Sequence, residues 1–195
     1  LRQRMFFAGG FGLDSPSGVI RLLVRILLLT FVIEGAGAIP LFWGFLERGL
    51  SPSKALYNAV FHSVSAFCNA GFSLFSDNLE GYSKSVLVTG TVMILIVLGG
   101  LGFIVLAELR ERVRRGVRIS VHSRLVLLTT SMLILSGTLA LLSSEWNYSL
   151  NGLSPVWKAW NALFSSITPR TAGFDTLAPA SFSSAGIFVL VLLMI

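Results

Sequence analysis

Asn69-Ala70-Gly71-Phe72 recurs as Thr171-Ala172-Gly173-Phe174, at an offset of 102 residues. Each of these two glycine loops ends a short apolar stretch rich in aromatic residues, and each precedes a polar turn and then a long apolar run. A membrane interior tolerates irregular backbone only where protein buries it or water bathes it. A repeated glycine loop between apolar spans therefore predicts a lined pathway through a membrane.

The composition is that of an integral membrane protein. The 195 residues are 54% hydrophobic and only 12% charged, with a mean hydropathy of +0.80, whereas soluble domains carry about 25% charged residues. The single cysteine, Cys68, allows neither an intrachain disulfide nor a metal site of clustered thiols. The chain lacks an initiator methionine and stops inside an apolar run, so we expect it to be a piece of a longer protein.

Arginines beside the apolar spans dominate the net charge of +6. They are Arg2, Arg4, Arg21 and Arg25 around the start of the first span, and Arg110, Arg112, Arg114, Arg115, Arg118 and Arg124 between two later spans. Short arginine-rich segments are typical of the cytoplasmic side of a membrane. Residues 108–124 contain no aromatic residue, unlike a single-stranded nucleic-acid surface, so no nucleic acid is expected as a partner. The later segment is either a topology signal alone or a docking surface for a cytoplasmic subunit or acidic lipid headgroups.

The alternation of apolar and polar segments predicts an all-α membrane protein with the order span, short helix, glycine loop and span, twice. Apolar spans are expected over about 19–46, 85–109 and 123–142, and from about 182 onward. The expected organisation is a cytoplasmic segment over 1–18, a repeat over 19–109 with a short helix at 54–68 and a loop at 68–72, a basic cytoplasmic linker over 110–122, and a truncated repeat over 123–195 with a short helix at 157–168 and a loop at 170–174.

Two further matches indicate a duplication. Arg25-x-x-Leu28-Leu29-Thr30 matches Arg124-x-x-Leu127-Leu128-Thr129 at an offset of 99, and Asn58-Ala59-Val60-Phe61 matches Asn161-Ala162-Leu163-Phe164 at an offset of 103. Offsets this similar are typical of a repeat with small gaps. With both basic segments in the cytoplasm, each repeat begins and ends inside, so we expect parallel repeats related by an axis along the membrane normal.

This layout favours a cation. A short helix that enters from outside points its carboxyl end at the bilayer centre, where the helix dipole leaves about half a negative charge and the last carbonyls have no intrahelical partner. The residues that can then present backbone carbonyls along an axis, as selectivity filters do, are Asn69, Ala70, Thr171 and Ala172. Gly71 and Gly173 supply dihedral angles or a close approach that a side chain would block. Phe72 and Phe174 would wedge each loop against neighbouring helices. Two such loops cannot enclose an axis, whereas four would.

Three stretches resemble the Trk/Ktr/HKT superfamily of potassium transporters. Residues 61–72 are similar to the second pore loop of that family, residues 168–175 to its third, and the glycine-rich residues 98–103 to the helix after the second loop. The resemblance covers essentially the whole chain as repeats two and three of four, arranged as in a K⁺ channel. The bacterial ion-translocating subunit, of the TrkH/KtrB type, is the nearest match.

That resemblance implies potassium uptake across the inner (plasma) membrane through a filter of backbone carbonyls, with K⁺ as the transported ion and no covalently bound cofactor. The ion-binding residues that it implies are Asn69, Ala70, Gly71, Thr171, Ala172 and Gly173, with Cys68 and Arg170 at the innermost loop positions. It also implies a homodimer in the lipid bilayer and a cytoplasmic nucleotide-binding regulatory subunit of the RCK/KTN type. The remaining repeats, and a gating segment beginning just after Ile195, would complete the pore.

Several alternatives stay open. Without the first and fourth loops, Na⁺ or Na⁺/K⁺ transport remains an alternative, because a Gly-to-Ser change in the first loop is the family's marker for Na⁺. Three glycines in the second span could form a gating hinge or pack against another helix; they are Gly99, Gly100 and Gly102. Glu34, an acid inside a span, is a functional candidate or bonds a nearby helix. Arg170 is expected to cap short-helix carbonyls or to pair with Asp175.

An enzyme is not expected. His62 and Cys68 are six residues apart on one helix, which separates them by about 240° and rules against a nucleophile pair. A membrane enzyme would have to depend on Glu34. A non-conducting membrane subunit, the other remote alternative, would not need two matched glycine loops.

Overall fold

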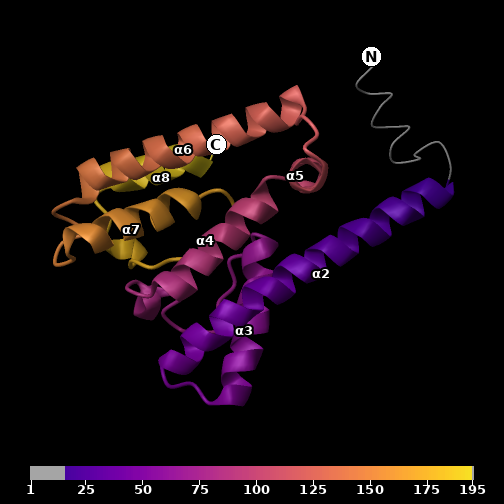
Figure 1. Cartoon of the computed structure of the whole chain (residues 1–195). Coiled ribbons are helices and arrows are strands. Elements are labelled where there is room, and N and C mark those ends of the chain that lie inside the picture. Colours follow the sequence, from indigo (N-terminus) through magenta and orange to yellow (C-terminus); the bar gives the residue numbers. More distant parts are fainter. Residues whose placement is uncertain (1–15, 195) are drawn as a thin grey trace.

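The computed structural model describes residues 16–194, and every regular element in that range is helical (Figure 1). The elements are α2 (Pro16–Glu47), α3 (Pro52–Phe67), α4 (Val86–Gly100), α5 (Phe103–Arg115), α6 (Val121–Glu145), α7 (Pro155–Ile167), α8 (Ser184–Met194) and two short 3₁₀ turns at Glu80–Tyr82 and Pro179–Ser181. This confirms the prediction of an all-α membrane protein. The predicted segment over 1–18 lies almost wholly outside the described residues, as does Ile195.

Two helices are long and apolar enough to cross a bilayer. They cover Leu23–Glu47 and Val121–Glu145, with hydropathies of 1.9 and 2.1, and each has 25 residues where about 20 suffice. The short helices α3 and α7 each begin with a serine followed by a proline, and proline suits the first turn because its missing N–H would have no partner there. With 16 and 13 residues, neither could cross the bilayer alone.

Six of the seven α-helices in the described range form two groups of three, and α5 contacts α6. α2, α3 and α4 pack against one another, and α6 contacts both α7 and α8, while α4 touches α7 across the boundary (Figure 1). The main core runs through both groups, because buried Phe45 and Val92 from the first belong to the same apolar cluster as Phe164 and Phe174 from the second. The two glycine loops are therefore carried on one continuous core.

Equivalent contacts recur in the two groups. Ser63 of α3 donates a hydrogen bond to the carbonyl of Glu34 on α2 (2.6 Å), and Ser166 of α7 donates one to the carbonyl of Ile134 on α6 (2.9 Å). A glycine three residues further along each long helix makes room for the serine. These glycines are Gly37 and Gly137, where an added methyl carbon would lie 2.7 and 2.4 Å from the serine hydroxyl.

The predicted span over 85–109 is not one straight helix, although α4 and α5 together are long and apolar enough for a broken span. The chain bends by 106° between α4 and α5. The break falls at Leu101 and Gly102, where Gly102 has a φ of +81°, a left-handed conformation that glycine adopts without the steric cost of a side chain. After the bend, Arg110–Arg115 belong to helix α5 and only the residues after Gly116 form a linker.

Candidate functional site

The two glycine loops lie against each other. A methyl carbon added to Gly71 would stand 2.2 Å from the carbonyl oxygen of Ala172 and 2.8 Å from the Cα atom of Gly173. One added to Gly173 would stand 3.3 Å from the Cα atom of Gly71. The fold thus brings together backbone segments about a hundred residues apart, at a distance that excludes a side chain at Gly71.

Both loops have the same unusual backbone conformation. Asn69 and Gly71 have φ of +52° and +71°, and Thr171 and Gly173 have φ of +69° and +72°. Left-handed conformations are uncommon for residues other than glycine, and for a β-branched residue such as Thr171 they are genuine outliers. Strain of this kind persists where the surroundings enforce it, and it clusters at functional sites.

Each loop follows the carboxyl end of its short helix directly. α3 ends at Phe67 and α7 at Ile167. The amide of Ala70 donates back to the carbonyl of Ser65 (2.8 Å), and that of Ala172 donates to the carbonyl of Thr168 (3.0 Å). The negative end of each helix dipole therefore lies at the loop.

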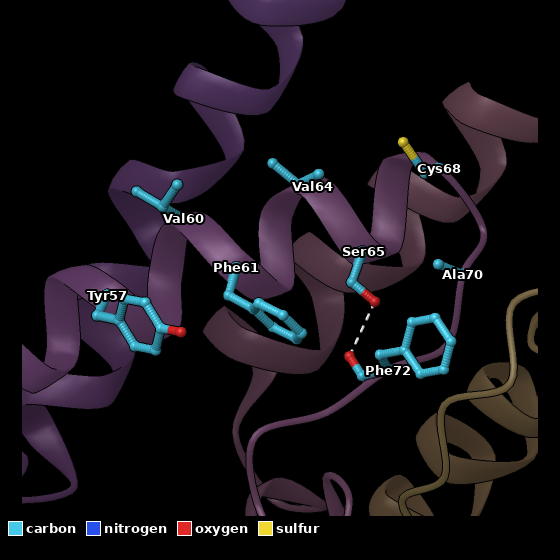
Figure 2. A pocket seen from close by; sticks show the side chains of 8 residues that line it. All are labelled: Tyr57, Val60, Phe61, Val64, Ser65, Cys68, Ala70 and Phe72. Atoms are coloured by element: carbon cyan, nitrogen blue, oxygen red, sulfur yellow. Dashed lines mark hydrogen bonds between the residues drawn. The ribbon is translucent and has the colours of Figure 1, made fainter.

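A hydroxyl group holds each loop at its far side. Ser65 donates to the carbonyl of Phe72 (2.8 Å; Figure 2), and Thr168 donates to the carbonyl of Phe174 (2.6 Å). Sequence reasoning missed these two residues. Their spacing could have revealed them, because Ser65 and Thr168 are 103 residues apart, the offset that relates the two short helices.

The two loop phenylalanines differ in burial. Phe174 is completely buried, whereas Phe72 is 69% exposed within the described chain. Phe72 instead borders an apolar groove of about 390 Å³ along the outer face of α3, together with Tyr57, Val64 and Ala70 (Figure 2). Within the described residues only Phe174 wedges its loop against neighbouring helices, and the wedge at Phe72 stays a prediction.

The two residues expected at the innermost loop positions contact the long helices. The thiol of exposed Cys68 lies 3.9 Å from the Oε1 atom of Glu34 on α2. Arg170 donates from Nη2 to the hydroxyl of Thr130 on α6 (3.1 Å). Among the described residues Arg170 makes no ion pair with Asp175, and its side-chain hydrogen bond goes to Thr130 and not to a short-helix carbonyl, so neither of the two expected partners is found.

Other candidates from the sequence have identifiable surroundings. His62 is fully buried, with Nδ1 2.8 Å from the carbonyl of Asn58 and Nε2 3.0 Å from the hydroxyl of Ser73. Glu34 is 8% exposed and touches the Cys68 thiol. These contacts join neither residue to a cluster of acid, base and nucleophile.

The three glycines of the predicted second span differ from one another. A methyl carbon added to Gly99 would stand 1.9 Å from the carbonyl oxygen of Phe67 at the end of α3, so Gly99 is a packing glycine. At Gly100 the nearest atom would be 3.5 Å away, and at Gly102 no atom lies within 4 Å. Gly102 is the residue at the bend.

Side chains that commonly bind metals do not gather within residues 16–194, where no group of three or more His, Cys, Asp or Glu could hold an ion. Oxygen ligands at the loops would have to come from backbone carbonyls and hydroxyls. Such oxygens suit hard cations in general.

Comparison with known proteins gives a consistent result. A family model described as TrkH, cation transport protein, matches residues 13–195. The chain is 35% identical over 197 residues to the potassium/sodium uptake protein NtpJ of Enterococcus hirae, covering 98% of this chain and 42% of that protein. It is 34% identical over 200 residues to the Ktr system potassium uptake protein B of Bacillus subtilis and 30% identical over 198 residues to that of Vibrio alginolyticus, covering 100% of this chain and 44% and 43% of those proteins. The chain spans less than half the length of these relatives.

Proposed function

The chain belongs to the TrkH family of cation transport proteins, and from this premise we propose that it contributes two parts of a potassium-selective filter to a K⁺ uptake protein. The observation that carries the proposal is the direct contact of the two glycine loops, which share one pattern of left-handed residues. Relatives named as potassium uptake proteins support K⁺ as the ion.

The proposed ligands are the backbone carbonyl oxygens of the two loops, which replace the water around a dehydrated cation. They belong to Asn69, Ala70, Gly71, Thr171, Ala172 and Gly173, with Cys68 and Arg170 next to them. Residues with positive φ alternate with Ala70 and Ala172. In an extended strand successive carbonyls point to opposite sides, and this alternation of φ breaks that pattern. The dipoles of α3 and α7 add a negative potential at the same point.

Transport of Na⁺, or of both ions, is the second candidate. Its support is the relative named as a potassium/sodium uptake protein. Catalysis is not part of the proposal, since the relatives are named as uptake proteins.

The proposal includes the assembly of the intact transporter. The remaining repeats of the protein would complete the ring of loops around the pore. Two copies would form a dimer in the cell membrane, and a cytoplasmic nucleotide-binding subunit would regulate them. The exposed arginines of α5 and the linker, which include Arg112, Arg114 and Arg118, support a cytoplasmic face at this end.

The test replaces the loop glycines in the full-length transporter. Gly71→Ser and Gly173→Ser should each lower the preference for Rb⁺ over Na⁺ in tracer uptake by proteoliposomes. Gly152→Ser is the matched control, because Gly152 also has a positive φ (+78°) but has no atom within 4 Å of an added carbon. Unchanged ion preference in both loop variants would refute the filter assignment.

A further inference from the structure

A segment after the first glycine loop, at Asn78 and Leu79, reaches across to the second. The side-chain amide of Asn78 donates to the carbonyl oxygen of Gly173 (3.3 Å), and the backbone amide of the next residue, Leu79, donates to the carbonyl of Asp175 (2.9 Å). Asn78 and Gly173 are 95 residues apart in the sequence. These two bonds join the outer turn of one glycine loop to the backbone of the other.

Asn78 is itself held in an unusual conformation. Its φ is +54°, and Asn69, Asn78 and Thr171 are the residues other than glycine with positive φ in the described chain. All three belong to the loops or to the turn between them. Asparagine tolerates this region better than most residues, so the position suits the residue that it holds.

The backbone of Asn78 lies against the side chain of Ser73, which the buried face of α3 contacts from the other side. The hydroxyl of Ser73 lies 3.2 Å from the carbonyl of Asn78 and accepts from the amide of Phe75 (3.1 Å). The same hydroxyl lies 3.0 Å from Nε2 of His62, a fully buried side chain whose ring stacks on Phe75 at 5.0 Å. Contacts therefore run from the buried face of α3, through Ser73 and the backbone of Asn78, to the carbonyl of Gly173, and the single hydroxyl proton of Ser73 goes either to Asn78 or to His62.

We propose that Asn78 is a positioning residue that fixes the direction of the Gly173 carbonyl and so contributes to ion selectivity. The inference rests on the proposed function of Gly173 as a filter residue. A carbonyl oxygen has two lone pairs, so it can accept the Asn78 amide and still face a cation with the other. Because selectivity depends on the number and field strength of the coordinating carbonyls, a fixed direction distinguishes K⁺ from Na⁺ better than a freely tilting one.

The position allows clean substitutions. Asn78→Gly removes the amide and keeps the positive φ without strain. Asn78→Asp keeps the shape of the side chain but replaces the donor with an oxygen that cannot donate when ionised. The backbone bond from Leu79 to Asp175 is available in both variants, so the segment stays docked.

The experiment compares these variants in the full-length transporter, reconstituted in proteoliposomes. We expect Asn78→Gly and Asn78→Asp each to lower the selectivity for Rb⁺ over Na⁺ by about 2- to 10-fold, the effect of one lost hydrogen bond. Asn151→Asp, an equivalent change at an exposed turn, should leave the ratio unchanged. If Asn78→Gly yields no protein, Ser73→Ala serves instead, because it removes the hydroxyl that contacts the backbone carbonyl of Asn78. This variant should also lower the selectivity for Rb⁺ over Na⁺.

Two results separate the possible failures. If both Asn78 variants keep the wild-type ratio while Gly173→Ser loses it, the filter stands and the role of Asn78 is refuted. If Gly173→Ser also keeps the ratio, the proposed function fails with it. A loss of thermal stability without a change in the ratio would show that Asn78 is only a structural link, and would likewise overturn the inference.

Discussion

At the scale of single residues, the site contains left-handed backbone conformations, which are unfavourable for most residues other than glycine. Asn69 and Thr171 adopt left-handed conformations, which cost an ordinary residue about 1–2 kcal/mol each. Each stands two residues before a loop glycine that is left-handed as well. The surrounding helices must supply that energy, since the conformations persist only where packing and hydrogen bonds impose them.

The two loop glycines should not tolerate alanine equally. At Gly71 an added carbon would stand 2.2 Å from the Ala172 carbonyl oxygen, whereas at Gly173 the nearest atom would be 3.3 Å away. Gly71→Ala must therefore displace the neighbouring loop, and Gly173→Ala needs only a small adjustment beyond the shared cost of a positive φ. We expect the larger loss of Rb⁺ uptake and of selectivity from Gly71→Ala, measured on equal amounts of purified protein. Equal losses would argue against direct contact of the loops.

The hydroxyl groups of Ser65 and Thr168 should matter for the same backbone. Each donates to the carbonyl of the phenylalanine that follows a loop glycine. Ser65→Ala and Thr168→Val remove the donor with little change of shape, and we expect each to cost about 1 kcal/mol. Thermal unfolding and Rb⁺/Na⁺ competition of the purified transporter measure the effect. Ser136→Ala, which removes an exposed hydroxyl on α6 bonded to its own helix, is the control.

At the scale of elements, the sequence predicted what depends on local pattern. The long apolar helices followed from the length of their apolar runs, and the two short helices from the alternation of apolar and polar segments, although each begins two residues earlier than predicted. The bend between α4 and α5 was only one of two alternatives, because Gly99, Gly100 and Gly102 could form a hinge or pack against another helix and the apolar run continues through residues 103–107. The bond from Asn78 to Gly173 was missed because no sequence pattern relates two residues that only the tertiary fold brings together.

The glycines near that bend give a prediction for the element scale. Gly99→Ala would place a carbon 1.9 Å from the backbone oxygen of Phe67, and such overpacking costs about 1–3 kcal/mol. Gly102→Ala meets no atom within 4 Å and bears only the cost of its φ of +81°, about 1–2 kcal/mol. Gly100→Ala, with its nearest neighbour at 3.5 Å, should be nearly neutral. Thermal unfolding of the three variants checks this order, and a Gly100 variant as unstable as the Gly99 one would contradict it.

At the scale of the whole molecule, the two helix groups are fastened to each other by α7. Trp160 donates from its ring nitrogen to the hydroxyl of Thr89 on α4 (2.8 Å), and buried Asn161 donates to the carbonyl of Ser83 just before α4 (3.0 Å). Asn161 and the equivalent Asn58 of α3 each donate to a carbonyl four residues earlier in their own helix, and Asn161 alone of the two adds the bond to Ser83. Of the two equivalent short helices, α7 therefore makes these side-chain bonds to the other group.

The charge distribution predicts how both groups are oriented in the membrane. Arginines gather in α5 and in the linker before α6, and such segments stay in the cytoplasm. In parallel repeats, the turn after the first glycine loop and the turn before α7 must then both face outward. Cysteines placed at exposed Ser76 and Asn151 should react with a membrane-impermeant thiol reagent applied to intact cells, and one at exposed Val117 only after the inner face is opened. These cysteines are introduced into a cysteine-free transporter, in which Cys68 is replaced by serine. Its Rb⁺ uptake is measured first, to show that it still folds. Labelling of Ser76→Cys and Asn151→Cys from opposite sides would refute the parallel arrangement, because an odd number of crossings would then separate the two loops.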